Sequence, residues 1–193
     1  MNRRVFKTPK TRLLSYCGII QDLNLIKIMV TMISKLMIKI NNLSDISIFA
    51  KNIALCLSPN FVIALNGNLG AGKTTLVRSI LQELGVIGRI KSPTFTYVEP
   101  YQVGDTEIYH FDLYRFCDEI EWFDLGFDEY IKYNSICFIE WAERATMAIA
   151  KIDWKITIDI GNDEARAIRV VAITEEGSTC LEKLTKLVDG LFN

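Results

Sequence analysis

A nine-residue stretch, GNLGAGKTT at positions 67–75, has the residue types and spacing that bind a phosphate chain. It matches G-x-x-x-x-G-K-[ST], in which glycines let backbone amides curl around phosphates and the next helix adds partial positive charge at its N-terminus. In this pattern Lys73 reaches the terminal phosphates, and the Thr74 hydroxyl holds Mg²⁺. The stretch predicts a nucleotide site.

The whole loop is expected to surround the nucleotide. No N-K-x-D signature of guanine-specific proteins follows it, which favours ATP. The arginines are scattered along the chain, whereas small-molecule kinases of this fold usually have an arginine-rich lid. The candidate binding residues in the loop are Asn68, Leu69, Gly70, Ala71, Gly72, Lys73, Thr74 and Thr75.

Two carboxylates are candidates for the metal and water side of such a site. Hydrolysis needs an acid to hold Mg²⁺ and a group to orient the attacking water. Asp112 follows the apolar segment IYHF and Glu140 follows ICFI. Both are expected at the C-terminal ends of strands, where α/β sheets build their sites. By this pattern alone either acid could hold the metal, or either could be an ordinary strand-end acid.

The single histidine, His110, shares a strand face with Asp112 because side chains alternate along a strand. It could orient Asp112 or be a buried, hydrogen-bonded spacer. A role as direct general base is less favoured, since phosphoryl transfer depends mainly on positioning and charge stabilisation.

Periodicity and turn signals predict the elements that position these residues. Ser44 or Asp45 is expected to cap the first helix, and Gly85 to end the helix that starts at Lys73. The order of elements predicts an α/β fold, a P-loop NTPase-type three-layer sandwich with a mixed, mainly parallel sheet and a C-terminal antiparallel hairpin. Strands are expected at 37–43, 61–65, within 94–101, 107–114, 135–141, 154–160 and 167–174, and helices after 44, at 73–84, in an interrupted 119–131 stretch and at about 181–191.

Composition predicts one domain over residues 37–193, with 50% hydrophobic and 23% charged residues in the chain. Residues 41–193 hold 14 basic and 22 acidic side chains, so this body is a poor non-specific binder of a phosphate backbone. We therefore expect this protein to contact nucleic acid only indirectly, through a partner protein. The five cysteines form no C-x-x-C pair, which favours buried thiols in a reducing compartment.

Residues 1–36 are expected to form a basic extension. Residues 1–40 carry eight basic side chains against one acidic. Lysines interrupt the apolar run that starts at Leu23, so no membrane span is expected, and the secretory-signal pattern is missing. An amphipathic surface helix, an organelle-transit extension and a translation start at Met32 or Met37 all stay open.

Five segments together resemble one known family. GNLGAGKTTLVR, KSPTFTYVEPY, YHFDLYR, LGFDEYI and ICFIEWAER, in this order over about residues 37–173, are similar to the TsaE (YjeE-like) ATPases. The resemblance implies a cytoplasmic protein that hydrolyses ATP slowly with Mg²⁺. Its partners would be TsaD-like and TsaB-like proteins, which threonylcarbamoylate adenosine 37 of tRNAs reading ANN codons. It would meet tRNA only through that complex.

The resemblance also implies residue roles. Lys73 and Thr74 would act on phosphate and Mg²⁺, with Glu140 as the metal-side acid and Asp112 as an acid that ATP hydrolysis requires. Further matches are Thr94 and Thr96 in the SPTFT segment near the γ-phosphate, Trp141 near the nucleotide and Arg166 near the adenine. A nucleotide-gated adaptor and a small-molecule kinase remain the alternative functions.

Overall fold

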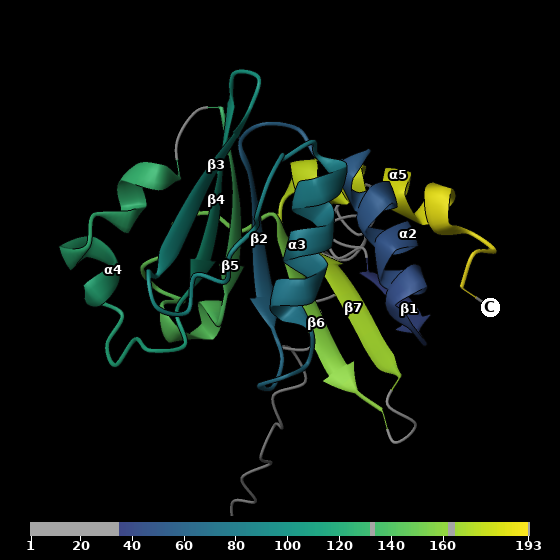
Figure 1. Ribbon diagram of the computed structural model, residues 1–193, viewed down its shortest axis with the longest axis horizontal. Coiled ribbons are helices and arrows are strands. Elements are labelled where there is room, and N and C mark those ends of the chain that lie inside the picture. Colours follow the sequence, from purple (N-terminus) through teal and green to yellow (C-terminus); the bar gives the residue numbers. More distant parts are fainter. Residues whose placement is uncertain (1–34, 132–133, 162–164, 193) are drawn as a thin grey trace, which may run out of the picture.

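The computed structural model describes residues 35–131, 134–161 and 165–192, so nearly all of the expected N-terminal extension lies outside the described residues. These residues form one seven-stranded sheet with the order β1-β7-β6-β2-β5-β4-β3 (Figure 1). The strands are β1 (Lys35–Ile40), β2 (Phe61–Asn66), β3 (Val98–Val103), β4 (Thr106–Asp112), β5 (Ser135–Glu140), β6 (Trp154–Ile160) and β7 (Arg166–Ala172).

The sheet is mixed, as the sequence predicts. Its centre is parallel, because β2 pairs in parallel with β5 and β6, and β4 pairs in parallel with β5. Both edges are antiparallel: β3 pairs with β4, and β1 pairs with β7. The predicted C-terminal hairpin is the antiparallel pair β6–β7. The parallel centre brings the C-terminal ends of β2, β4 and β5 to one edge.

Helices lie on both faces, which gives the predicted three layers. The helices α2 (Leu43–Ala54), α3 (Lys73–Glu83) and α5 (Glu175–Val188) cover one face and share one hydrophobic cluster with it (Figure 1). The other face is covered by α4 (Glu121–Asp124), the 3-10 helices η1 (Phe127–Tyr130) and η2 (Ala142–Arg144), and their flanking residues. Within the described residues, no helix is long and apolar enough to cross a bilayer.

The central strand β2 shows why the continuous apolar run predicts a buried strand. Phe61, Ile63 and Leu65 pack into the cluster on the α3 face, whereas Val62 and Ala64 pack on the α4 face. Alternating side chains reach both faces, so every position must be apolar. Burying each large side chain contributes roughly 1.5–3 kcal/mol.

Two helix starts differ from the prediction. The cap of α2 is Asn42, whose side chain accepts from the Asp45 backbone amide, rather than Ser44 or Asp45. The helix α5 starts at Glu175, six residues before the expected 181, because Thr174 caps it through the Gly177 amide. Its first turn is polar and small, so apolar periodicity does not mark it.

Two other segments are shorter than predicted. The 119–131 stretch is two short helices separated by Gly126, whose left-handed backbone (φ 68°) ends the first. Residues 94–97 form a turn in which the Thr96 and Tyr97 amides donate to the Pro93 carbonyl, so β3 starts only at Val98. Thr94 therefore lies on a loop.

A buried aspartate joins the sheet to α5. Asp153 is fully buried; its Oδ2 accepts from the Val62 amide at 2.9 Å and lies 3.1 Å from Lys151 Nζ. Its Oδ1 accepts from the Thr174 hydroxyl at 2.6 Å. We expect Asp153→Ala to lower the free energy of unfolding by about 3 kcal/mol in a urea titration, because it leaves a buried amide and a lysine without their acceptor.

Asp159→Ala is the matched control. Asp159 also pairs with a cation, Arg169, at 3.3 Å, but the two side chains are 60% and 47% exposed. Solvent screens such a pair, so the expected loss is at most about 0.5 kcal/mol. Equal losses in the two variants would contradict the role given to Asp153.

Candidate functional site

The glycine-rich loop joins β2 to α3, as its motif requires. Gly67 has φ 144°, and a Cβ atom there would collide with the Ile158 carbonyl. Gly72, with φ 106°, directly precedes Lys73, the first residue of α3. Backbone amides and the positive end of the helix therefore meet at this loop, an arrangement suited to an anion.

Lys73 is buried at the loop, with 4% of its surface exposed. Its Nζ donates to the carbonyl oxygens of Gly67 (2.6 Å) and Asn68 (3.1 Å) and lies 3.8 Å from the centroid of the Trp141 ring. Burial lowers the pKa of Lys73, because the ammonium loses water, while nearby carboxylates including Glu140 oppose this change. An anion in the loop would favour the charged form.

Asp112 and Glu140 lie side by side at the ends of β4 and β5. They are direct partners in the parallel register and are 4% and 2% exposed. The Thr74 hydroxyl donates to Glu140 Oε2 at 3.0 Å. Buried acids next to a buried lysine are typical of functional sites.

Hydrogen bonds fix the orientation of Asp112. Its Oδ2 accepts from the Thr94 hydroxyl at 2.6 Å, and its Oδ1 accepts from the Tyr114 amide at 2.9 Å. Thr94 thus connects the loop before β3 to the strand-end acid. A ligand that drew Thr94 away would alter the surroundings of Asp112.

A cavity of about 240 Å³ lies over this group. It brings together the N-terminus of α3, both strand-end acids and the loop that carries Thr94. Trp141, which directly follows Glu140, has a left-handed backbone (φ 57°) that is uncommon for a large side chain. The cavity is lined by Leu69, Gly70, Gly72, Lys73, Thr74, Thr75, Thr94, Asp112, Tyr114, Glu140 and Trp141.

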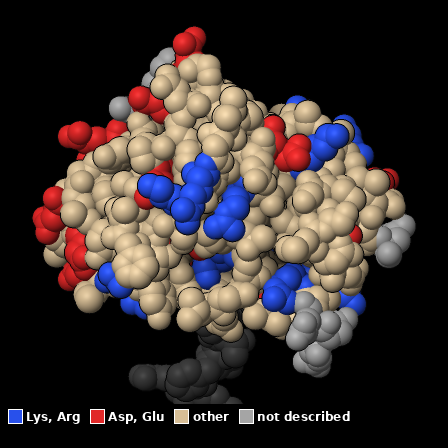
Figure 2. All heavy atoms as spheres, viewed as in Figure 1, with Lys and Arg blue, Asp and Glu red and all other residues tan. Residues whose placement is uncertain are grey.

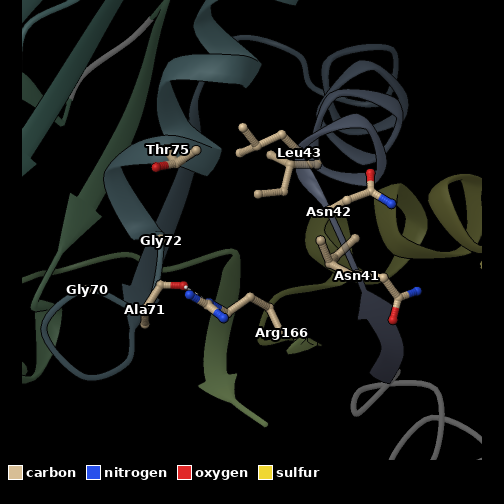
Figure 3. A pocket seen from close by; sticks show the side chains of 10 residues that line it. Asn41, Asn42, Leu43, Gly70, Ala71, Gly72, Thr75 and Arg166 are labelled. Atoms are coloured by element: carbon tan, nitrogen blue, oxygen red, sulfur yellow. Dashed lines mark hydrogen bonds between the residues drawn. The ribbon is translucent and has the colours of Figure 1, made fainter. Parts of the chain in front are cut away.

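A second cavity, of about 220 Å³, adjoins the first and shares Gly70, Gly72 and Thr75 with it (Figure 3). Arg166, the first residue of β7, extends along its floor and donates from Nε to the Ala71 carbonyl at 3.0 Å. Its opposite wall is the start of α2, where Leu43 is 71% exposed. The remaining lining residues are Ile40, Asn41, Asn42 and Ile46.

The structure brings most of the sequence-predicted residues together, but Thr96 and Asn68 line neither cavity. The Thr96 hydroxyl donates to Glu99 at 2.8 Å. Asn68 contributes its backbone carbonyl through the contact with Lys73. His110 is buried and its Nε2 forms a hydrogen bond with Glu140, which agrees with the interpretation of a buried, hydrogen-bonded side chain rather than with one that orients Asp112.

Sequence reasoning missed Tyr114 and the wall at the start of α2. Tyr114 lies two residues after Asp112, and its ring packs 5.1 Å from that of Trp141. The α2 wall reaches the loop because α2 packs beside α3 and β1 pairs with β7, and no local signal reveals these long-range contacts.

The oxygen donors of the first cavity suit a hard divalent cation. Thr74 and Glu140 offer one hydroxyl and one carboxylate. Among the described residues, no cluster of three or more histidines, cysteines or acids could form an all-protein metal cage. Mg²⁺ bound through few side chains, water and phosphates matches this donor set.

A mixed α/β sheet whose central strand runs through a G-x-x-x-x-G-K-T loop into a helix defines a protein of the P-loop NTPase type. A family model described as "Threonylcarbamoyl adenosine biosynthesis protein TsaE" matches residues 40–168, more than half of the chain. The chain therefore belongs to the TsaE family, which acts in the biosynthesis of threonylcarbamoyladenosine in tRNA.

Individual relatives agree with this assignment. The TsaE protein of Haemophilus influenzae is 44% identical over 120 residues, which cover 62% of this chain and 75% of the relative. The Bacillus subtilis TsaE protein is 34% identical over 145 residues, covering 75% and 90%. The crystal structure of Bacillus subtilis YdiB superposes with a TM-score of 0.69 at 31% identity, covering 80% of this chain and 97% of that one.

Proposed function

We propose that this protein binds ATP with Mg²⁺ and hydrolyses it slowly, as a partner-activated subunit of the machinery that threonylcarbamoylates adenosine 37 of tRNAs reading ANN codons. The observation that carries the ATPase part is the buried lysine at the N-terminus of α3, facing two buried strand-end carboxylates across one cavity. Family membership supports the tRNA modification part.

Each residue has a distinct task in this proposal. Lys73 exchanges its backbone carbonyl partners for phosphate oxygens and neutralises their charge. Thr74 and Glu140 hold the metal ion, which supplies charge stabilisation at the phosphates. Asp112, fixed by Thr94 and the Tyr114 amide, orients the attacking water. The products are ADP and phosphate.

The second cavity is the proposed place of the adenosine. It continues the phosphate-side cavity past Gly72 and Thr75, and apolar Leu43 lies opposite Arg166 (Figure 3). The apolar side chain of Ile46 also lines this cavity. An apolar wall facing a planar cation suits an aromatic base, which can stack on both.

The charge distribution supports an indirect encounter with tRNA. Acidic side chains gather at the α4 end of the molecule, whereas basic ones lie across the middle of the face that carries α3 (Figure 2). Residues 116–131 contain six acidic and no basic side chains. Such an end repels a phosphate backbone, so we propose that TsaD-like and TsaB-like partners hold the tRNA.

Depletion of the protein tests the pathway directly. We expect threonylcarbamoyladenosine in bulk tRNA, measured by mass spectrometry, to fall; an unchanged level would contradict the proposal. A pull-down with and without ATP tests for the TsaD-like and TsaB-like partners. Labelled γ-phosphate found on a metabolite rather than in inorganic phosphate would favour the kinase alternative.

Arg166→Ala tests the adenosine cavity. Losing one charged contact corresponds to about 1.4 kcal/mol, so we expect ADP affinity in calorimetry to fall about tenfold. Arg169→Ala, an exposed arginine on the same strand, is the matched control and should leave the affinity unchanged. If both variants bind ADP like the wild type, the base lies elsewhere.

A further inference from the structure

The only histidine of the chain is placed against the metal-side acid. His110 is fully buried on β4, and its Nε2 lies 2.8 Å from Glu140 Oε1. In the β4–β5 register Glu140 is opposite Asp112, so His110 reaches it diagonally from two residues earlier on the same face. Glu140 is thus held from two sides, by His110 at Oε1 and by Thr74 at Oε2.

The two ring nitrogens of His110 differ: Nε2 contacts Glu140, whereas Nδ1 is buried and has no hydrogen-bond partner among the described residues. A buried polar atom left unsatisfied is unfavourable, and an apolar side chain would avoid it. When Glu140 is ionised it can only accept, so Nε2 carries the hydrogen and donates. The imidazole therefore serves the orientation of the carboxylate rather than simple core packing.

We propose that His110 is a positioning residue that fixes the rotamer of Glu140, so that Oε2 points to Thr74 and the cation beside it. This inference rests on the proposed binding of Mg²⁺ and nucleotide. Without the donor at Oε1, Glu140 can rotate away from Thr74, and its charge is no longer held at the metal position. Partners of this kind, which orient a metal-binding carboxylate from behind, typically change metal affinity about 10–100-fold.

The test compares the affinity for a non-hydrolysable ATP analogue in excess Mg²⁺ with the affinity in EDTA. Their ratio is the Mg²⁺-dependent gain in binding. His110→Leu removes the donor, and we expect this gain to fall about tenfold or more while the affinity in EDTA stays at the wild-type value. His110→Gln should keep the gain, because the Nε2 atom of glutamine is the same number of bonds from Cα and can donate.

Trp122→Phe is the matched core control. Trp122 is also fully buried with an unpartnered ring nitrogen within the described residues, but it packs in the cluster on the α4 face. We expect it to leave the Mg²⁺-dependent gain unchanged. If His110→Leu does not fold, His110→Asn gives the same comparison, because its shorter amide ends before the position of Nε2.

The outcomes separate this inference from the proposed function. A wild-type protein that binds the analogue equally well with and without Mg²⁺ would overturn the metal part of the proposed function, and this inference with it. If the wild type shows the Mg²⁺-dependent gain and His110→Leu keeps it, the role of His110 alone is overturned. The same holds if Trp122→Phe reduces the gain as much as His110→Leu does. A gain that His110→Leu loses and His110→Gln keeps supports the role of His110.

Discussion

Lys73→Ala is expected to abolish nucleotide binding. The variant removes the buried ammonium that faces the cavity, and two charged hydrogen bonds to phosphate are together worth about 3 kcal/mol or more, about 100-fold or more in affinity. We therefore expect calorimetry to detect weak ADP binding or none, and phosphate release to disappear. In the wild type, bound phosphate opposes the lowering of the Lys73 pKa, so binding near that pKa should take up protons.

Lys155→Ala provides the comparison for Lys73→Ala. Lys155 is an exposed lysine on β6, so its loss changes the net charge equally without touching the cavity. Its ADP affinity should match the wild type. Unchanged binding in Lys73→Ala, with a melting temperature close to the wild type, would show that the loop does not hold the phosphates.

Asp112→Asn is expected to separate binding from hydrolysis. Asparagine keeps an oxygen that can accept from the Tyr114 amide, so the local geometry should survive. The variant loses the negative charge that we propose orients the attacking water, and a positioned acid or base of this kind contributes about 10²–10⁴-fold to the turnover number. ADP affinity should remain near the wild type or rise, because one acid facing the phosphates is gone. Phosphate release and calorimetry measure the two effects.

The level of threonylcarbamoyladenosine in cells with Asp112→Asn distinguishes an ATPase from a nucleotide-gated adaptor. A strain that carries only this variant should lose threonylcarbamoyladenosine if hydrolysis resets the modification complex. Normal modification without hydrolysis would instead favour the nucleotide-gated adaptor. Asp105→Asn, in the exposed turn before β4, controls for the charge change. Hydrolysis that persists in Asp112→Asn would contradict the role of Asp112.

The central part of the site follows from sequence because its signals are local. The apolar run of β2, the glycines and Lys73 are adjacent in the chain, and the motif determines their geometry. Asp112 and Glu140 could be placed at strand ends because both follow apolar segments. Their direct pairing depends on the β4–β5 register, which sequence pattern alone did not give.

Other features depend on contacts between distant segments. The sequence leaves His110 either as a residue that orients Asp112 or as a buried, hydrogen-bonded spacer. The structure agrees with the second interpretation, and its partner is Glu140, because the parallel pairing of β4 with β5 brings that acid within reach. Thr96 was placed with Thr94 by family pattern, yet the 94–97 turn directs its hydroxyl to Glu99. The start of α5 depends on Thr174, which accepts from the Gly177 amide and also donates to Asp153, the residue just before the paired strand β6.

The second cavity has a consequence for how the protein is made. Its walls come from residues 40–46, the glycine-rich loop and Arg166, so they span 127 residues of the chain from Ile40 to Arg166. The strand β1 pairs with β7, which is synthesised long after β1. A partly synthesised chain can form the phosphate loop, but it cannot enclose a whole nucleotide. If this cavity holds the adenosine as proposed, full-affinity nucleotide binding therefore requires that synthesis has passed β7 and that β7 has paired with β1.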